Sequence, residues 1–115
     1  MCGRYTLLAS WHELSALFNL KKSEPLNIKA RYNIAPTQRA PLIRLGKIGP
    51  KLSMVRWGLV PHWVDKPSAK FSLINARLES VTEKASFRKA FMSRRCLIPT
   101  SGWFEWHVQN NEKRP

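Results

Sequence analysis

The sequence has few cysteines and no long hydrophobic run. Its two cysteines, Cys2 and Cys96, form no CxxC pair, so a disulfide-rich scaffold is excluded and a metal site would need other ligands. His12, His62 and His107 show no metal-ligand spacing, and we assign no metal or other cofactor. No segment reaches the roughly 18 apolar residues of a membrane span, and the N-terminus does not read as a secretory signal. We therefore expect a cytoplasmic protein without a membrane partner.

Acidic residues are also scarce. Seven Asp and Glu stand against 20 Lys and Arg, which gives a net charge of +13. The cations are spread from Arg4 to Arg114, so they form a basic surface and not a basic tail. Such a surface attracts polyanions, nucleic acid first. A solvated basic face and affinity for an anionic membrane surface remain the alternatives.

What the chain does contain suffices for one domain, residues 1–115. Hydrophobic residues make up 43% of the sequence, including five Trp and five Phe. We predict an α+β fold, mainly antiparallel sheet with two short helices. A helix over about 10–20 begins at Ser10, which with Glu13 forms a capping box, and a basic helix covers 82–92. Extended segments are expected at 3–8, 41–45, 51–57, 73–77, 95–99 and 102–108, with loops at 21–31, 32–38 and 58–67 and a turn toward another strand at 109–115.

Cys2 is the first candidate for chemistry. Removal of the initiator Met, which is usual before a small residue, would leave Cys2 as the free N-terminus. The α-amine and the thiol of such a residue are both partly deprotonated at neutral pH. A 1,2-aminothiol condenses with an aldehyde to an imine that closes to a thiazolidine, and an N-terminal thiol can also act in acyl transfer. The alternative is that position 2 is merely a small residue.

Glu105 is the second candidate, because it lies among Trp103, Phe104 and Trp106. On a strand face toward the core, the apolar surroundings would disfavour its charged form and suit it to proton transfer near neutral pH. The alternative is a strand residue that faces outward beside His107, with Phe104 and Trp106 in the core.

Polar and aromatic residues suggest a binding surface. Asn75 and Arg77 share a face of the 73–77 segment, and an amide beside a cation suits a phosphate or a sugar hydroxyl. Asn33 offers another amide in the irregular segment before Pro36. Trp63 could stack on an exposed base. Loop hydrogen bonding for the two Asn residues and core packing for Trp63 are the alternatives.

Taken together, six motifs in order resemble one family over essentially the whole chain. They are Met1-Cys2-Gly3-Arg4-Tyr5, Tyr32-Asn33-Ile34-Ala35-Pro36, Arg56-Trp57-Gly58-Leu59-Val60-Pro61, Ile74-Asn75-Ala76-Arg77-Leu78-Glu79, Arg94-Arg95-Cys96-Leu97-Ile98-Pro99 and Ser101-Gly102-Trp103-Phe104-Glu105-Trp106. The sequence is similar to the SRAP family of SOS response-associated peptidases, or abasic-site-processing proteins. The resemblance implies an SRAP-like, partly closed sheet or barrel.

The resemblance also implies an activity. Cys2, freed by autopeptidase removal of the preceding residue, would cross-link to the aldehyde of an abasic site in single-stranded DNA as a thiazolidine. It would thus act as a lyase-like and thiol-hydrolase enzyme of the DNA damage response, near the nucleoid in a bacterium. Asn75 would orient the opened sugar, and Glu105 would shuttle protons. Basic residues that hold phosphates match Arg4 and Arg77, and residues of the DNA-binding cleft match Asn33, Pro36 and Trp63.

The sequence departs from the family in length. Family domains are about twice as long, and a later catalytic His of the family has no counterpart here. We therefore expect the N-terminal half of an SRAP domain, truncated or completed by another chain. A non-covalent binder of single-stranded DNA, a thiol peptidase and an inactive remnant are the competing hypotheses.

Overall fold

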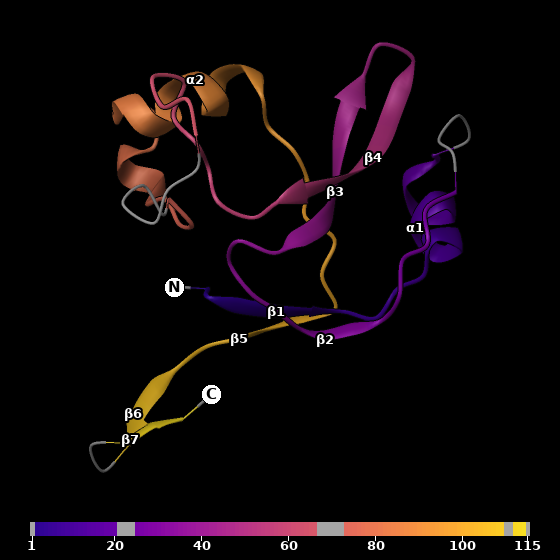
Figure 1. Cartoon of the computed structure of the whole chain (residues 1–115), viewed down its shortest axis with the longest axis horizontal. Helices are drawn as coiled ribbons and strands as arrows, with labels where there is room; N and C mark the ends of the chain where they lie inside the picture. The colour runs from indigo at the N-terminus through magenta and orange to yellow at the C-terminus, as the bar shows by residue number, and fades with distance from the viewer. Residues whose placement is uncertain (1, 21–24, 67–72, 110–111, 115) are drawn as a thin grey trace.

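The computed structural model describes residues 2–20, 25–66, 73–109 and 112–114, and these form an α+β fold of mainly antiparallel strands (Figure 1). This confirms the predicted fold class. In chain order the elements are β1 (Arg4–Leu7), α1 (Trp11–Phe18), β2 (Arg31–Ile34), β3 (Arg39–Gly46), β4 (Gly49–Arg56), η2 (Leu78–Ser80), α2 (Ala85–Ser93), β5 (Gly102–Phe104), β6 (His107–Gln109) and β7 (Glu112–Arg114).

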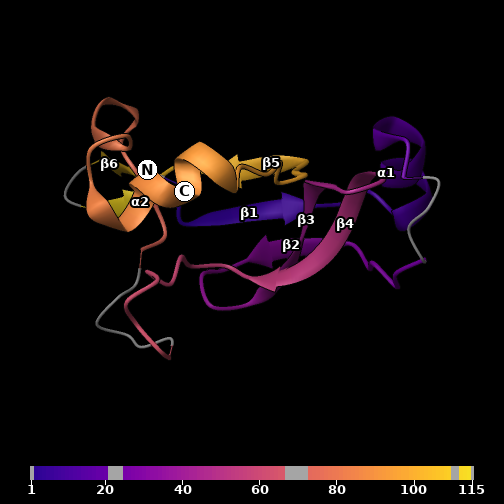
Figure 2. The same cartoon turned by 90° about the horizontal axis from the view of Figure 1, so that it is seen from above.

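The strand that begins the chain lies at the centre of a sheet ordered β2–β1–β5 (Figure 2). Both neighbours of β1 are antiparallel to it, and Tyr5 stands opposite Ile34 on one side and Trp103 on the other. Residues directly opposite in a ladder point to the same face. Because Tyr5 and Ile34 are buried, this face is the inner one.

A long hairpin lies over the inner face of this sheet. Its strands β3 and β4 pair from Arg39 with Arg56 to Gly46 with Gly49, so the turn is two residues long. Ala40 packs with the buried side chains of the β2–β1–β5 sheet, whereas Ile43 and Leu52 pack with Leu14 and Leu20 around α1. The hairpin thus joins the two parts of the core.

Helix α1 begins where the sequence predicts. The Ser10 hydroxyl accepts the Glu13 N–H at 3.3 Å, and the Glu13 carboxylate accepts the Ser10 N–H at 2.7 Å. These two hydrogen bonds form the capping box. The same hydrogen bonds, from the Ser10 backbone first and its hydroxyl second, lower the pKa of Glu13. The helix ends at Asn19, which adopts the left-handed conformation that closes helices.

Four predicted segments differ from the structure. The 95–99 segment, predicted to be extended, forms no strand: Leu97 alone bridges to Ile43, and Leu97 is 57% exposed. The 102–108 strand is broken, because β1 begins at Arg4 and leaves nothing for residues beyond Phe104 to pair with, so β6 pairs with β7 instead. Strand β2 lies in segments predicted to be loops, and α2 begins three residues later than expected. The strand after 109 is present, as predicted, and its turn at 110–111 lies outside the described residues.

None of the helices in the described ranges is long and apolar enough to cross a membrane.

The capping box makes a testable contribution to stability. Replacement of Ser10 by Ala removes the acceptor for the Glu13 N–H, and we expect it to lower the free energy of unfolding by about 1 kcal/mol in urea. Ser10→Thr retains a hydroxyl that can accept the Glu13 N–H and donate to the Glu13 carboxylate, so it should stay near wild type. Equal stability of Ser10→Ala and wild type would show that the cap contributes nothing.

Candidate functional site

Cys2 lies two residues before the start of β1 and is half-buried. Its thiol donates to the Arg4 carbonyl oxygen at 3.5 Å. The Asn75 side-chain amide donates to the Cys2 carbonyl oxygen at 2.9 Å, across 73 positions of sequence. Two of the predicted catalytic residues are therefore in direct contact. Asn75 contacts the Cys2 backbone, so the structure gives it a role in holding Cys2 in place.

Two contacts with the chain after β4 fix the position of Asn75. The Leu59 N–H donates to the Leu73 carbonyl at 2.9 Å, which makes a single bridge between the two segments. The Trp57 indole N–H donates to the Ile74 carbonyl at 3.4 Å. Both bonds are accepted by backbone carbonyls of the two residues before Asn75. They therefore fix the backbone from which the Asn75 side chain reaches Cys2.

Trp57 is itself held from two sides. Its ring meets the Tyr5 ring edge to face, with centroids 5.4 Å apart. Its backbone exchanges hydrogen bonds with the turn before β3: the Thr37 N–H donates to the Trp57 carbonyl and the Trp57 N–H to the Gln38 carbonyl, both at 2.9 Å. Contacts therefore run from β1 through Trp57 and the 73–75 segment back to Cys2.

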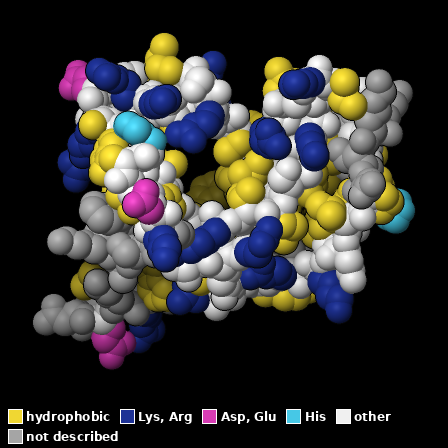
Figure 3. Space-filling view, turned by 45° about the horizontal axis from the view of Figure 1, so that its top comes forward, with side chains coloured by type: hydrophobic (Ala, Val, Ile, Leu, Met, Phe, Trp, Pro, Cys, Tyr) yellow, Lys and Arg dark blue, Asp and Glu magenta, His cyan; other side chains and the backbone are white. Residues whose placement is uncertain are grey.

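Cys2 borders a cavity of about 830 Å³ between the sheet and the hairpin. The lining is mainly apolar, and Arg56 and Arg94 add two cations to it. Its apolar lining residues include Tyr5, Leu42, Val55, Trp57, Leu59, Ile74, Ile98 and Trp103. The face shown in Figure 3 is hollowed in the middle, with hydrophobic side chains in the hollow and Lys and Arg around it. An apolar cavity with a thiol at its border is suited to bind an organic substrate.

Tyr5 is a residue of this cavity that the sequence analysis did not single out. Burial disfavours the phenolate and raises the pKa of Tyr5, whereas the nearby Arg31 opposes this shift. Alternation of buried Tyr5 and Leu7 along β1 was the signal that could have identified it as an inward residue.

Arg4 and Asn33 form a pair beside the Cys2 end of β1. The Arg4 guanidinium donates to the Asn33 side-chain oxygen at 2.8 Å. Each was predicted separately as a DNA-binding residue, and the structure joins them. Pro36 lies in the turn that follows, where Thr37 has the positive φ of 72° that is unusual for a β-branched residue. The hydrogen bond to Trp57 holds this turn in place.

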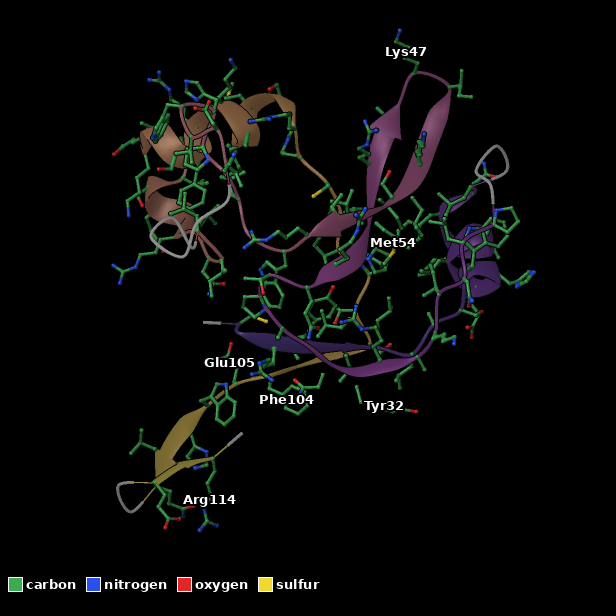
Figure 4. The ribbon with its side chains drawn as sticks, viewed as in Figure 1. Tyr32, Lys47, Met54, Phe104, Glu105 and Arg114 are labelled. Carbon is green, nitrogen blue, oxygen red and sulfur yellow. The ribbon has the colours of Figure 1, made fainter. Side chains whose placement is uncertain are left out.

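Glu105 follows the last residue of β5 and is exposed (Figure 4). The apolar environment predicted for it is therefore absent. The physical reason is that the pairing of β1 with β5 ends at Arg4 and Phe104. Glu105 therefore follows the last paired residue of β5, just as Gly3 precedes the first residue of β1. The register thus leaves the carboxylate at the same end of β1 as Cys2.

Trp63 and Arg77 do not line the cavity beside Cys2. Trp63 is 50% exposed and packs edge to face on His62, with ring centroids 4.9 Å apart, so it is not the core residue of the alternative interpretation. Arg77 is exposed at the start of η2, where it makes no side-chain cap. In the described part of the chain, no group of three or more His, Cys, Asp or Glu residues could hold a metal ion.

The fold and this site define a class: an α+β protein in which a half-buried cysteine next to the N-terminus is held by a distant amide at an apolar cavity. The family model described as SOS response associated peptidase (SRAP) matches residues 1–115. The chain therefore belongs to the SRAP family, as its motifs predicted.

Relatives and a solved structure agree with this assignment. The chain is 37% identical to the abasic site processing protein YoqW of Bacillus subtilis over 107 residues, which are 92% of this chain and 48% of YoqW. It is 31% identical to the abasic site processing protein YedK of Escherichia coli, covering all of this chain and 52% of YedK. The crystal structure of a phage-related protein from Bordetella bronchiseptica superimposes with a TM-score of 0.70 at 29% identity, over 95% of this chain and 49% of that one. The chain thus spans about half the length of these proteins.

The buried phenol of Tyr5 predicts a pH dependence of stability. A pKa raised in the folded state contributes stability below the ordinary value of 10.0, and this contribution is lost as the pH rises through the raised pKa. We expect wild type to lose more thermal stability above pH 10 than Tyr5→Phe, which has no phenol to ionise. The comparison is a melting series from pH 8 to 11, with Tyr32→Phe as the exposed control. If the melting temperatures of wild type and Tyr5→Phe fell in parallel over this pH range, a raised pKa of Tyr5 in the folded state would be contradicted.

Proposed function

We propose that this protein processes abasic sites in single-stranded DNA by forming a covalent cross-link through Cys2. The observation that carries the proposal is the hydrogen bond from Asn75 to the Cys2 carbonyl, because it holds Cys2 at the border of a cavity. A nucleophile must meet its electrophile at about 3–3.5 Å in a fixed orientation, and such a restraint supplies the orientation. The printed names of the relatives, abasic site processing proteins, support the same substrate.

The chemistry begins with a free N-terminal Cys2, which requires hydrolysis of the bond between Met1 and Cys2. The Cys2 amine then attacks the aldehyde carbon of the opened sugar, and the carbonyl oxygen leaves as water, so that an imine forms. The Cys2 sulfur adds to the imine carbon, and its proton passes to the nitrogen. The product is a thiazolidine, and no oxidant or reductant takes part. In this scheme Asn75 fixes Cys2 and helps to orient the sugar, and Glu105 carries protons from its position at the end of β5.

Electrostatics supports a single-stranded nucleic acid as the partner. The net charge is +13, and Lys and Arg side chains are spread over the face shown in Figure 3. Arg4 lies two residues from Cys2 and hydrogen-bonds to a neutral amide, so it keeps its positive charge for a phosphate. Two further predicted DNA-binding residues lie close in sequence to these contacts. Arg77 comes two residues after Asn75, and Pro36 comes three residues after Asn33. Exposed Trp63 could stack on a base.

A second candidate function is non-covalent binding of single-stranded DNA. It is favoured by the excess of 20 Lys and Arg over seven Asp and Glu, which supplies affinity for a polyanion without any covalent step.

The cross-link is tested by intact mass and denaturing gel analysis after incubation with single-stranded abasic DNA. We expect loss of Met1, an adduct with wild type, and complete loss of the adduct in Cys2→Ala with single-strand affinity retained within about twofold, because phosphate contacts supply the affinity. Cys96→Ala is the matched control and should keep the adduct, since Cys96 lines the same cavity but carries no α-amine that could form the imine.

Two other outcomes decide between the candidates. Met1 removal and salt-dependent binding without any adduct would leave the non-covalent function. Parallel loss of binding and adduct in Cys2→Ala would make Cys2 a structural residue.

A further inference from the structure

The outer face of the β2–β1–β5 sheet carries the Arg4–Asn33 pair described above, and the aromatic side chains beside this pair have no role in the contacts described so far. Along β1, Tyr5 and Leu7 point inward, so Arg4 and Thr6 point outward. Phe104 pairs directly with Arg4 and shares its face. Figure 4 shows Phe104 and Tyr32 on the side of the sheet away from the β3–β4 hairpin. This face therefore presents aromatic side chains from both outer strands.

A β-bulge is what places Tyr32 on this face. The register changes between the Tyr5–Ile34 and Leu7–Arg31 pairs, so two residues of β2 stand opposite one residue of β1. Both of them, Tyr32 and Asn33, are exposed, and the Tyr32 side chain is 69% exposed. Without the bulge, alternation would turn one of the two into the core.

A positive charge lies between the two rings. Arg4 projects from the central strand, and the bulge residue Asn33 holds its guanidinium at 2.8 Å. Tyr32 and Phe104 stand on strands two spacings apart, about 10 Å, so they can contact two different groups of one ligand. An exposed ring on one side of an oriented cation and a half-buried ring on the other match an alternating ligand of flat bases and phosphates.

We propose that Tyr32, Arg4 and Phe104 form a stacking platform for the bases of single-stranded nucleic acid, with a phosphate at Arg4. The inference rests on the proposed function and extends it, because Arg4 is two residues from Cys2 and the platform would continue the path of the strand from the reacting sugar onto the outer face of the sheet. Stacking is possible for every base, so the platform would hold the strand without reading its sequence.

The test measures fluorescence anisotropy of an undamaged, labelled oligothymidylate, with inorganic polyphosphate as a competitor that has charge and no bases. We expect Tyr32→Ala to weaken oligonucleotide binding by about fivefold or more and to leave polyphosphate competition unchanged. Tyr32→Phe keeps a ring and should bind as wild type does. Phe104→Leu preserves apolar burial beside Arg4 and should also weaken oligonucleotide binding alone.

Leu17→Ala, at an exposed side chain of α1 away from the sheet, is the control and should change neither affinity. The platform is wrong if Tyr32→Ala and Phe104→Leu bind the oligonucleotide like wild type, or if they weaken both ligands equally. The adduct assay separates this result from the proposed function. An intact Cys2 adduct without any effect of Tyr32 would overturn the platform alone, whereas a Tyr32 effect without an adduct would overturn only the covalent chemistry.

Discussion

The hydrogen bond from the Trp57 indole to the Ile74 carbonyl, together with the neighbouring Leu59–Leu73 bridge, joins the chain after the hairpin to the segment that carries Asn75. Trp57 also touches Tyr5 with its ring and the Thr37–Gln38 turn with its backbone. This one residue thereby connects the central strand, the turn before the hairpin and the segment that carries Asn75. A large aromatic side chain with a single polar group suits this task, because it can fill apolar space and still direct one hydrogen bond.

Much of the local structure was predictable because its causes are local. Ser10 and Glu13 lie three residues apart, as a capping box requires, and the alternation of Tyr5 and Leu7 marks a strand. The resemblance to the SRAP family brought Cys2 and Asn75 together as candidates before any contact between them was known. What the sequence could not show is that Asn75 binds the backbone of Cys2, because that contact depends on the Trp57 and Leu59 contacts with the 73–74 segment.

The failed predictions at 95–99 and 102–108 have a common physical origin. Hydrophobic runs such as 95–99 and 102–108 predict buried strands only if partner strands lie on their sides. Leu97 finds one partner residue, and Trp103 and Trp106 remain 64% and 51% exposed. Glu105 is exposed for the same reason, because its neighbours Trp103 and Trp106 are themselves exposed and do not cover it.

The β-bulge in β2 makes the outer face of the central sheet depend on a count of residues. As long as β2 holds one residue more than β1 needs, Tyr32 and Asn33 both face outward while Ile34 stays in the core. Deletion of Tyr32 or Asn33 would remove the bulge, so that a single residue would stand opposite Thr6 while Ile34 and Arg31 kept their partners. The core side of the strand would then be unchanged, and only the outer face would lose a side chain. The extra residue of β2 therefore enlarges the outer surface of the sheet without altering the core.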